Sequence, residues 1–207
     1  KEPYRILMKP KFAVSAILLL MTASLAQTGT AQQAEDLYQG TVVTRQETQD
    51  SITYTLKEDL SFSGFRTEDT VFAGSVFFNQ LADHTRPASE SVMTFTGTGM
   101  SMSFDDCSSI HSDRWVNDNE GGGAIRGETL TFTDMGDLSF NNCKSIVNAD
   151  TNAGGAVNAR GDITFSHMGN ISFTNNMLGD DSQQGQALGG ALFTWGKIDF
   201  ENTKSIL

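Results

Sequence analysis

The sequence contains few cysteines, few prolines and few basic residues. Two cysteines and three prolines among 207 residues exclude a small scaffold held by several disulfide bonds and a proline-rich linker protein. Acidic residues outnumber basic ones by 25 to 14, so no nucleic-acid partner is expected. The glycine pairs stand in no phosphate-binding pattern, and no Cys/His ligand spacing occurs. The sequence therefore predicts no cofactor, no metal ion and no catalytic residue.

Residues 1–26 have the pattern of a secretory signal peptide. Lysines precede an apolar run from Phe12 to Leu25, and small residues follow this run. The run is shorter than the roughly 18–20 uninterrupted apolar residues of a transmembrane helix. We expect export through a cleaved signal peptide, with a few extra residues before Met8.

From Met93 onward the sequence repeats itself. Each copy has two apolar–polar–Phe triplets, and the phenylalanines at 104, 140 and 173 are 36 and 33 residues apart, a period typical of repeat proteins. A repeat region is predicted for residues 93–207, preceded by an N-terminal cap region at 27–92. The cap contains a degenerate copy, in which Ile52–Tyr54, Leu60–Phe62 and Ala73–Val76 follow in the same order. The full copies are Met93–Phe95 with Met102–Phe104, Leu130–Phe132 with Leu138–Phe140, Ile163–Phe165 with Ile171–Phe173, and the opening Ile198–Phe200.

A Gly-Gly-Ala motif with a following aliphatic residue stands between the copies. Two adjacent glycines let a backbone turn without a Cβ clash, which predicts a tight corner. We expect the alanines of successive motifs to stack there. The motifs are Gly122-Gly123-Ala124-Ile125, Gly154-Gly155-Ala156-Val157 and Gly189-Gly190-Ala191-Leu192.

The triplets predict short strands with two side chains inward and one outward. Three strands a repeat are too few for a propeller blade of four, so we expect like strands of successive repeats to stack at about 4.8 Å, with Phe over Phe. This predicts an all-β fold, a right-handed parallel β-helix or solenoid of about 33–36-residue repeats. The alternative is a series of antiparallel hairpins, because the joins between triplets contain glycine.

The repeats resemble the polymorphic outer membrane proteins of chlamydiae. The resemblance covers residues 93–207 and depends on the Gly-Gly-Ala motifs and on Phe-x-x-Asn, which Phe173 and Asn176 obey. The sequence departs from this pattern in the other copies, where Cys107, Cys143 and Thr203 stand at the Asn position.

The resemblance implies an autotransporter passenger at the cell surface. It implies an adhesin with a role in virulence that binds a host-cell surface receptor, and association with other copies of the family. Localisation would be the cell outer membrane, through a C-terminal barrel not present in this chain, or secretion. Leu207 falls within a repeat, so we expect an N-terminal fragment or a truncated product. The alternative function is a polysaccharide-active lyase or hydrolase, because parallel β-helices also carry such enzymes.

Cys107 and Cys143 occupy equivalent positions of adjacent repeats. Stacked strands would bring their Cα atoms within the roughly 4.4–6.8 Å that a disulfide tolerates. Two buried thiols that pack as small hydrophobic groups are the alternative. The sequence leaves both open.

Candidate receptor contacts lie in the segments between the repeats. Trp115 is an aromatic residue among charges, in the longest of three loops predicted at 108–120, 144–153 and 177–188. It either contacts a partner or folds back over the edge of the repeats. Arg160-Gly161-Asp162 is the tripeptide that integrins recognise, although a glycine at this turn is also explained by backbone geometry.

Overall fold

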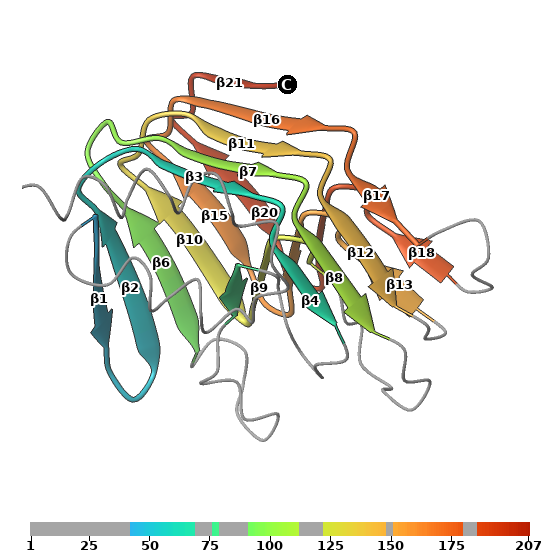
Figure 1. Ribbon diagram of the computed structural model, residues 1–207. Helices are drawn as coiled ribbons and strands as arrows, with labels where there is room; N and C mark the ends of the chain where they lie inside the picture. Colours follow the sequence, from blue (N-terminus) through green and yellow to red (C-terminus); the bar gives the residue numbers. More distant parts are fainter. Residues whose placement is uncertain (1–41, 69–75, 79–90, 112–121, 148–150, 180–185) are drawn as a thin grey trace, which may run out of the picture.

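The computed structural model of the chain is built from β-strands (Figure 1). It describes residues 42–68, 76–78, 91–111, 122–147, 151–179 and 186–207. In these ranges every regular element is a strand, which confirms the predicted all-β class. The predicted signal peptide lies outside the described residues. No helix in the described ranges is long and apolar enough to cross a membrane.

Two large sheets contain the strands that the triplets predict. In both sheets, strands at the same position of successive repeats pair in parallel, with each phenylalanine opposite its counterpart. The first sheet, in spatial order, is β1 (Val43–Glu47), β2 (Ser51–Leu56), β6 (Val92–Thr96), β10 (Thr129–Thr133), β15 (Ile163–Ser166) and β20 (Ile198–Glu201). The second is β3 (Leu60–Ser63), β7 (Met102–Asp105), β11 (Leu138–Asn141), β16 (Asn170–Thr174) and β21 (Ser205–Ile206).

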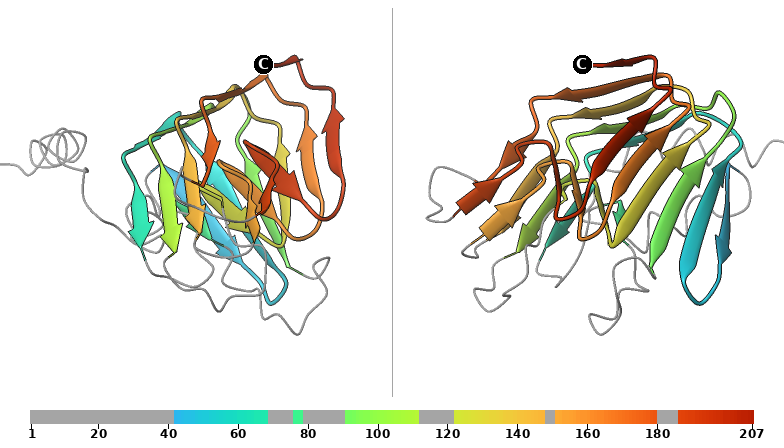
Figure 2. Two further views of the ribbon diagram at one scale, coloured as in Figure 1. Left: turned by 90° about the vertical axis from the view of Figure 1, so that its right-hand side faces the viewer. Right: turned by 180° about the vertical axis from the view of Figure 1, so that it is seen from behind.

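Three smaller sheets complete the stack, as the two views of Figure 2 show. One contains β4 (Arg66–Glu68), β8 (Ser108–His111), β12 (Lys144–Val147) and β17 (Met177–Leu178). Another contains β5 (Phe77–Phe78), β9 (Ile125–Gly127), β14 (Val157–Ala159) and β19 (Leu192–Thr194). The last pairs β13 (Thr151–Ala153) with β18 (Gln186–Leu188).

We call the strands of one repeat a layer. The layers are β2–β5, β6–β9, β10–β14, β15–β19 and, last, β20–β21. Every pairing between layers of the described residues is parallel, so the alternative of antiparallel hairpins is wrong for them. In the part of the chain that the structure describes, the one antiparallel pair joins β1 to β2 at the N-terminal end.

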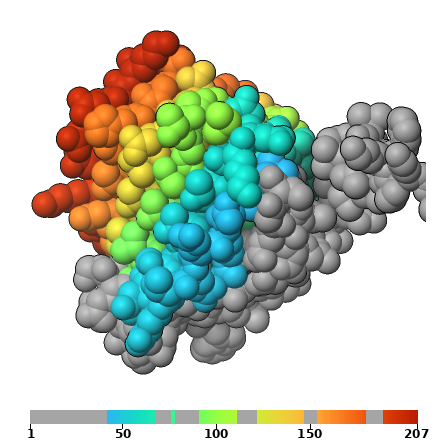
Figure 3. Space-filling view, turned by 90° about the vertical axis from the view of Figure 1, so that its left-hand side faces the viewer, coloured from blue at the N-terminus to red at the C-terminus, as the bar shows by residue number. Residues whose placement is uncertain are grey.

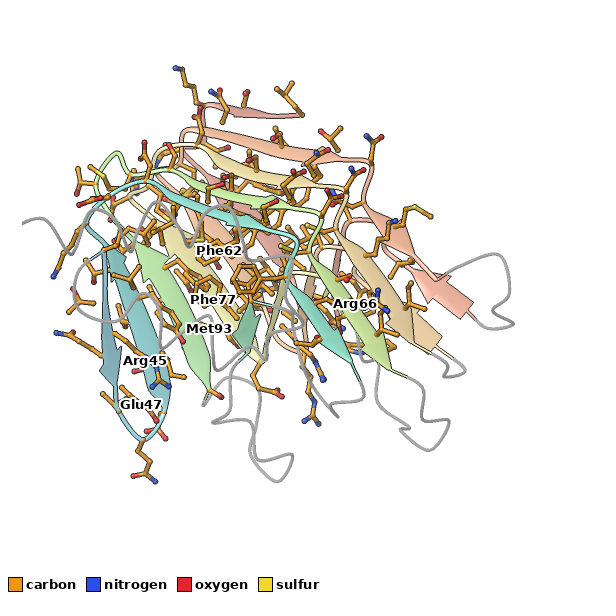
Figure 4. All side chains as sticks on the ribbon, in the orientation of Figure 1. Arg45, Glu47, Phe62, Arg66, Phe77 and Met93 are labelled. Atoms are coloured by element: carbon orange, nitrogen blue, oxygen red, sulfur yellow. The ribbon has the colours of Figure 1, made fainter. Side chains whose placement is uncertain are left out.

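Two columns of stacked aromatic rings form the core, as the sequence predicts. Ring centroids of neighbouring layers are 4.8–5.2 Å apart, with interplanar angles of 3–14°. Phe77 lies between the columns and meets Tyr54 and Phe62 edge to face at 5.0 and 5.3 Å; Figure 4 shows Phe62 and Phe77 side by side in the interior. The columns are Tyr54, Phe95, Phe132, Phe165 and Phe200, and Phe62, Phe104, Phe140 and Phe173.

The three predicted loops begin with strands, which corrects the prediction of three strands a repeat. Among the described side chains of β8 and β12, Ser109 and Ser145 are buried, while Ile110 and Ile146 are half-exposed. A strand whose inward side chains are small and polar has no apolar alternation, so the pattern did not reveal it. The second and third of these predicted loops also end in strands, β13 and β18.

The N-terminal region supplies the first layer and covers one end of the sheet. Tyr54 pairs with Phe95 and Phe62 with Phe104, as the degenerate copy predicts. The third match is displaced by one residue, because Phe77, not Val76, lies opposite Ile125. The hairpin of β1 and β2 lies on the N-terminal face, in blue and cyan in Figure 3. β1 therefore occupies the edge of β2 that another layer would need.

Candidate binding surface and the contacts between layers

The two glycines of each Gly-Gly-Ala motif have different roles. The first has positive φ, at 100°, 63° and 66° for Gly122, Gly154 and Gly189, a conformation that side chains disfavour. The second permits close packing, because a Cβ on Gly155 would meet the carbonyl oxygens of Gly190 and Met177. The alanines stack through backbone bonds, such as Ala156 N–H to the Ala191 carbonyl at 2.8 Å.

The Asn of Phe-x-x-Asn bonds to the preceding layer. The Asn176 amide donates to the Phe140 carbonyl at 3.1 Å, and its oxygen accepts the Cys143 N–H at 2.9 Å. The Cys143 thiol lies in the same way against the Phe104 carbonyl, at 3.8 Å. A thiol is a weak donor. Cysteine therefore replaces asparagine at this position while keeping the same acceptor in the layer below.

Both cysteines are buried and unbridged in the structure. Cys107 and Cys143 have no exposed surface. We therefore expect neither to react with an alkylating reagent in the folded protein and both to react after denaturation, as measured by intact mass. A mass two hydrogens lower, with no alkylation of the unfolded chain, would contradict this prediction.

A column of polar side chains, which the sequence analysis missed, links all layers at one corner. Asp59 Oδ1 accepts the Ser101 N–H at 2.8 Å, and Ser101 Oγ accepts the Asp137 N–H at 3.1 Å. Asp137 Oδ1 in turn accepts the Asn170 N–H at 2.7 Å, and Ser205 Oγ donates to Asn170 Oδ1 at 2.8 Å. A signal was present: a polar residue directly precedes each second triplet.

Asp137 makes the stack sensitive to acid. The Asn170 backbone N–H, with its side-chain amide at 3.0 Å, holds the pKa of Asp137 below its ordinary value. A carboxyl with a lowered folded-state pKa stabilises the fold above its unfolded pKa of about 3.9 and loses this contribution as the pH falls through the folded value.

We expect Asp137→Ala to lower the unfolding free energy at pH 7 by about 0.5–1 kcal/mol, a small value because the carboxyl is exposed to solvent. The difference from the unsubstituted chain should shrink below about pH 4. Urea midpoints measured from pH 7 to pH 2.5 check this. Asp199→Asn removes a charge from an exposed side chain and is the control; an equal acid response in the two variants would contradict the role of Asp137.

The Arg160-Gly161-Asp162 tripeptide is engaged by the neighbouring layers. Asp162 Oδ1 accepts the backbone N–H of Lys197 at 2.8 Å. The Arg160 guanidinium lies 4.0 Å from the buried carboxylate of Glu128. Thr194 Oγ1 donates to the Gly161 carbonyl. These contacts give the tripeptide a role in joining layers.

Three inter-repeat segments follow adjacent strands. β8 and β12 pair in parallel over their whole length, and β17 pairs with the start of β12. The segments that follow these strands therefore begin side by side, at one edge of the molecule. Trp115, the predicted contact residue, and residues 180–185 of the third segment lie outside the described residues. We call this edge the loop edge, defined by His111, Val147 and Leu178.

The acidic residues of the described ranges do not gather into a catalytic arrangement. Asp105 accepts the Asn141 amide at 2.6 Å, and Asp106 occupies a positive-φ corner with φ of 51°. No group of three or more metal-ligating side chains occurs in the part of the chain that the structure describes. No protein-family model, no curated protein and no solved structure matches the chain.

Proposed function

We propose that the chain is an exported adhesin that binds a host-cell surface receptor, with its repeats forming a right-handed parallel β-helix. The observation that carries the proposal is the loop edge, where three segments of different length and sequence begin on adjacent, in-register strands. A rigid scaffold that displays several polar loops side by side suits recognition of another macromolecule. The likeness of the repeats to chlamydial polymorphic outer membrane proteins supports a place at the cell surface.

The scaffold beneath the loops supports binding more than catalysis. Aromatic columns fill the interior, and the described polar side chains at its corners bond to the next layer. Polysaccharide lyases and hydrolases need carboxyl groups that converge on one substrate at roughly 5–9 Å. The contacts of Asp105 and Asp162 instead serve the fold.

Attachment of the purified protein to host cells tests the proposal. We expect saturable attachment, reduced by Trp115→Ala in the first loop. Trp195→Ala is the matched control, because Trp195 is 61% exposed and follows β19, which belongs to a different sheet from β8, β12 and β17. Asp162→Glu should leave attachment unchanged, since Asp162 serves the scaffold. A parallel polysaccharide-cleavage screen decides the alternative: turnover without attachment would replace the adhesin by an enzyme.

A further inference from the structure

The C-terminal end of the stack exposes side chains that every earlier layer buries. Ile198 is 42% exposed, whereas its counterpart Ile163 in the layer below has no exposed surface. Ile206 is 49% exposed, and its counterpart Ile171 is fully buried. We call this surface the open end, defined by strands β17 to β21; Figure 2 shows these strands, in orange and red, at one side of the stack.

Gly190 indicates what the open end accommodates. At the equivalent glycines, Gly123 and Gly155, a Cβ would collide with backbone atoms of a neighbouring strand and with the carbonyl oxygen of the next motif. At Gly190 a Cβ would meet nothing within 4 Å, and its φ is not in the left-handed region. Neither close packing nor backbone conformation in the described chain requires a glycine there. The glycine would be required if a further layer stacked on Gly190 in the same way as Gly190 stacks on Gly155, because the carbonyl oxygen of that layer would then occupy the place of a Cβ.

The strands at the open end run parallel to the strands of the layer beneath them. The N–H groups of Gly155 and Ala156 donate to the carbonyls of Gly190 and Ala191 at 2.9 and 2.8 Å. Within the described residues no later motif supplies a carbonyl to Gly190 and Ala191. The N–H groups of Gly190 and Ala191 therefore stand where a further layer could accept the same parallel hydrogen bonds that join the earlier layers.

The two ends of the stack differ. At the N-terminal end β1 covers the edge of β2 in the antiparallel direction, and Phe77 fills the space between the aromatic columns. A second copy placed head to tail would meet this covered edge. The acidic excess of the chain also opposes self-association.

We propose that the open end binds a further layer of the same repeat in the same chain direction: a segment with a Gly-Gly-Ala corner and two apolar–polar–Phe strands that pair in parallel with β19, β20 and β21. Gly190 is the residue that determines this specificity, because it leaves room for the incoming carbonyl. The proposal depends on the observed register and not on the adhesin role.

A lengthened chain tests the proposal. Leu207 lies opposite Ser172, since Ile206 pairs with Ile171 and the Phe173 N–H donates to the Leu207 carbonyl at 3.0 Å. A second copy of residues 173–206, joined after Leu207, therefore continues the register. We expect hydrogen-exchange protection of the Gly190 and Ala191 amides to rise by at least about tenfold. The denaturation midpoint should rise as well.

Gly190→Ala is the matched control in both chain lengths. In the original chain the added methyl group has space and should change little. In the lengthened chain it should abolish the extra protection at Gly190 and Ala191. Protection that does not rise on lengthening, while β10 amides remain protected, would overturn the proposal, as would an equal effect of Gly190→Ala in the two lengths. Dimerisation of the original chain, abolished by Gly190→Ala, would assign the open end to a second copy instead.

Discussion

Alanine at Gly155 is expected to destabilise the fold by about 3–4 kcal/mol, near the upper end of single substitutions. The added Cβ would meet the Gly190 carbonyl oxygen and would lie 2.6 Å from the Met177 carbonyl oxygen. Both are backbone oxygens, one in strand β17 and one in the corner between β18 and β19 that bonds to Gly155, so no side-chain rotation relieves the collision. The Gly155 N–H bond to Gly190, 2.9 Å long, would lengthen or break.

Equilibrium urea denaturation of Gly155→Ala and Gly190→Ala measures this effect. The two glycines occupy equivalent positions of neighbouring layers, and a methyl group on Gly190 meets no atom within 4 Å. Gly190→Ala should therefore stay within about 0.5 kcal/mol of the unsubstituted chain. Equal losses in both variants would mean that glycine is required for local backbone conformation and not for the distance between layers.

The aromatic columns and their register could be predicted from the sequence because the inward residues are large and recur at a constant place. Phe104 and Phe140 each end a triplet, and the triplets differ little from copy to copy. The strands β8 and β12 could not be predicted, because their inward residues include Ser109 and Ser145. Burial of a hydroxyl depends on neighbours far along the chain, and a local pattern does not contain them.

The candidate site shows the same division. The Arg160-Gly161-Asp162 tripeptide is visible in the sequence, yet the partner of its carboxylate, Lys197, is 35 residues further on. The glycine pairs predict corners, but the sequence does not show that the two glycines have different roles. The structure shows that the first glycine is needed for its positive φ and that the second is needed because a neighbouring layer leaves no space for a Cβ. Contacts between layers thus decide which polar residues are free to bind a partner.

The polar corners also explain how the stack keeps one register. A shift of one residue would place each inward phenylalanine on the outer face. It would also separate Asp137 Oδ1 from the Asn170 N–H and Asp162 Oδ1 from the Lys197 N–H. Apolar columns and side-chain acceptors therefore favour the same alignment.

Phe140→Ala is expected to destabilise the fold by about 3–5 kcal/mol, through the lost burial of the ring and the cavity left behind. Phe140 is fully buried and stacks on both sides, at 4.8 Å on Phe104 and 5.2 Å on Phe173. Closing the cavity would require the two layers to approach, and their paired strands prevent this. The denaturation midpoint in urea, at unchanged slope, measures the loss.

Phe200→Ala is the matched control for this prediction. Phe200 stacks on one side only, at 4.9 Å on Phe165, and is partly exposed at the open end. Its removal should cost about 1–2 kcal/mol, because neighbouring water fills the space that the ring leaves. If both substitutions cost the same, ring stacking between layers would not be what stabilises the core, and burial of single side chains would account for it.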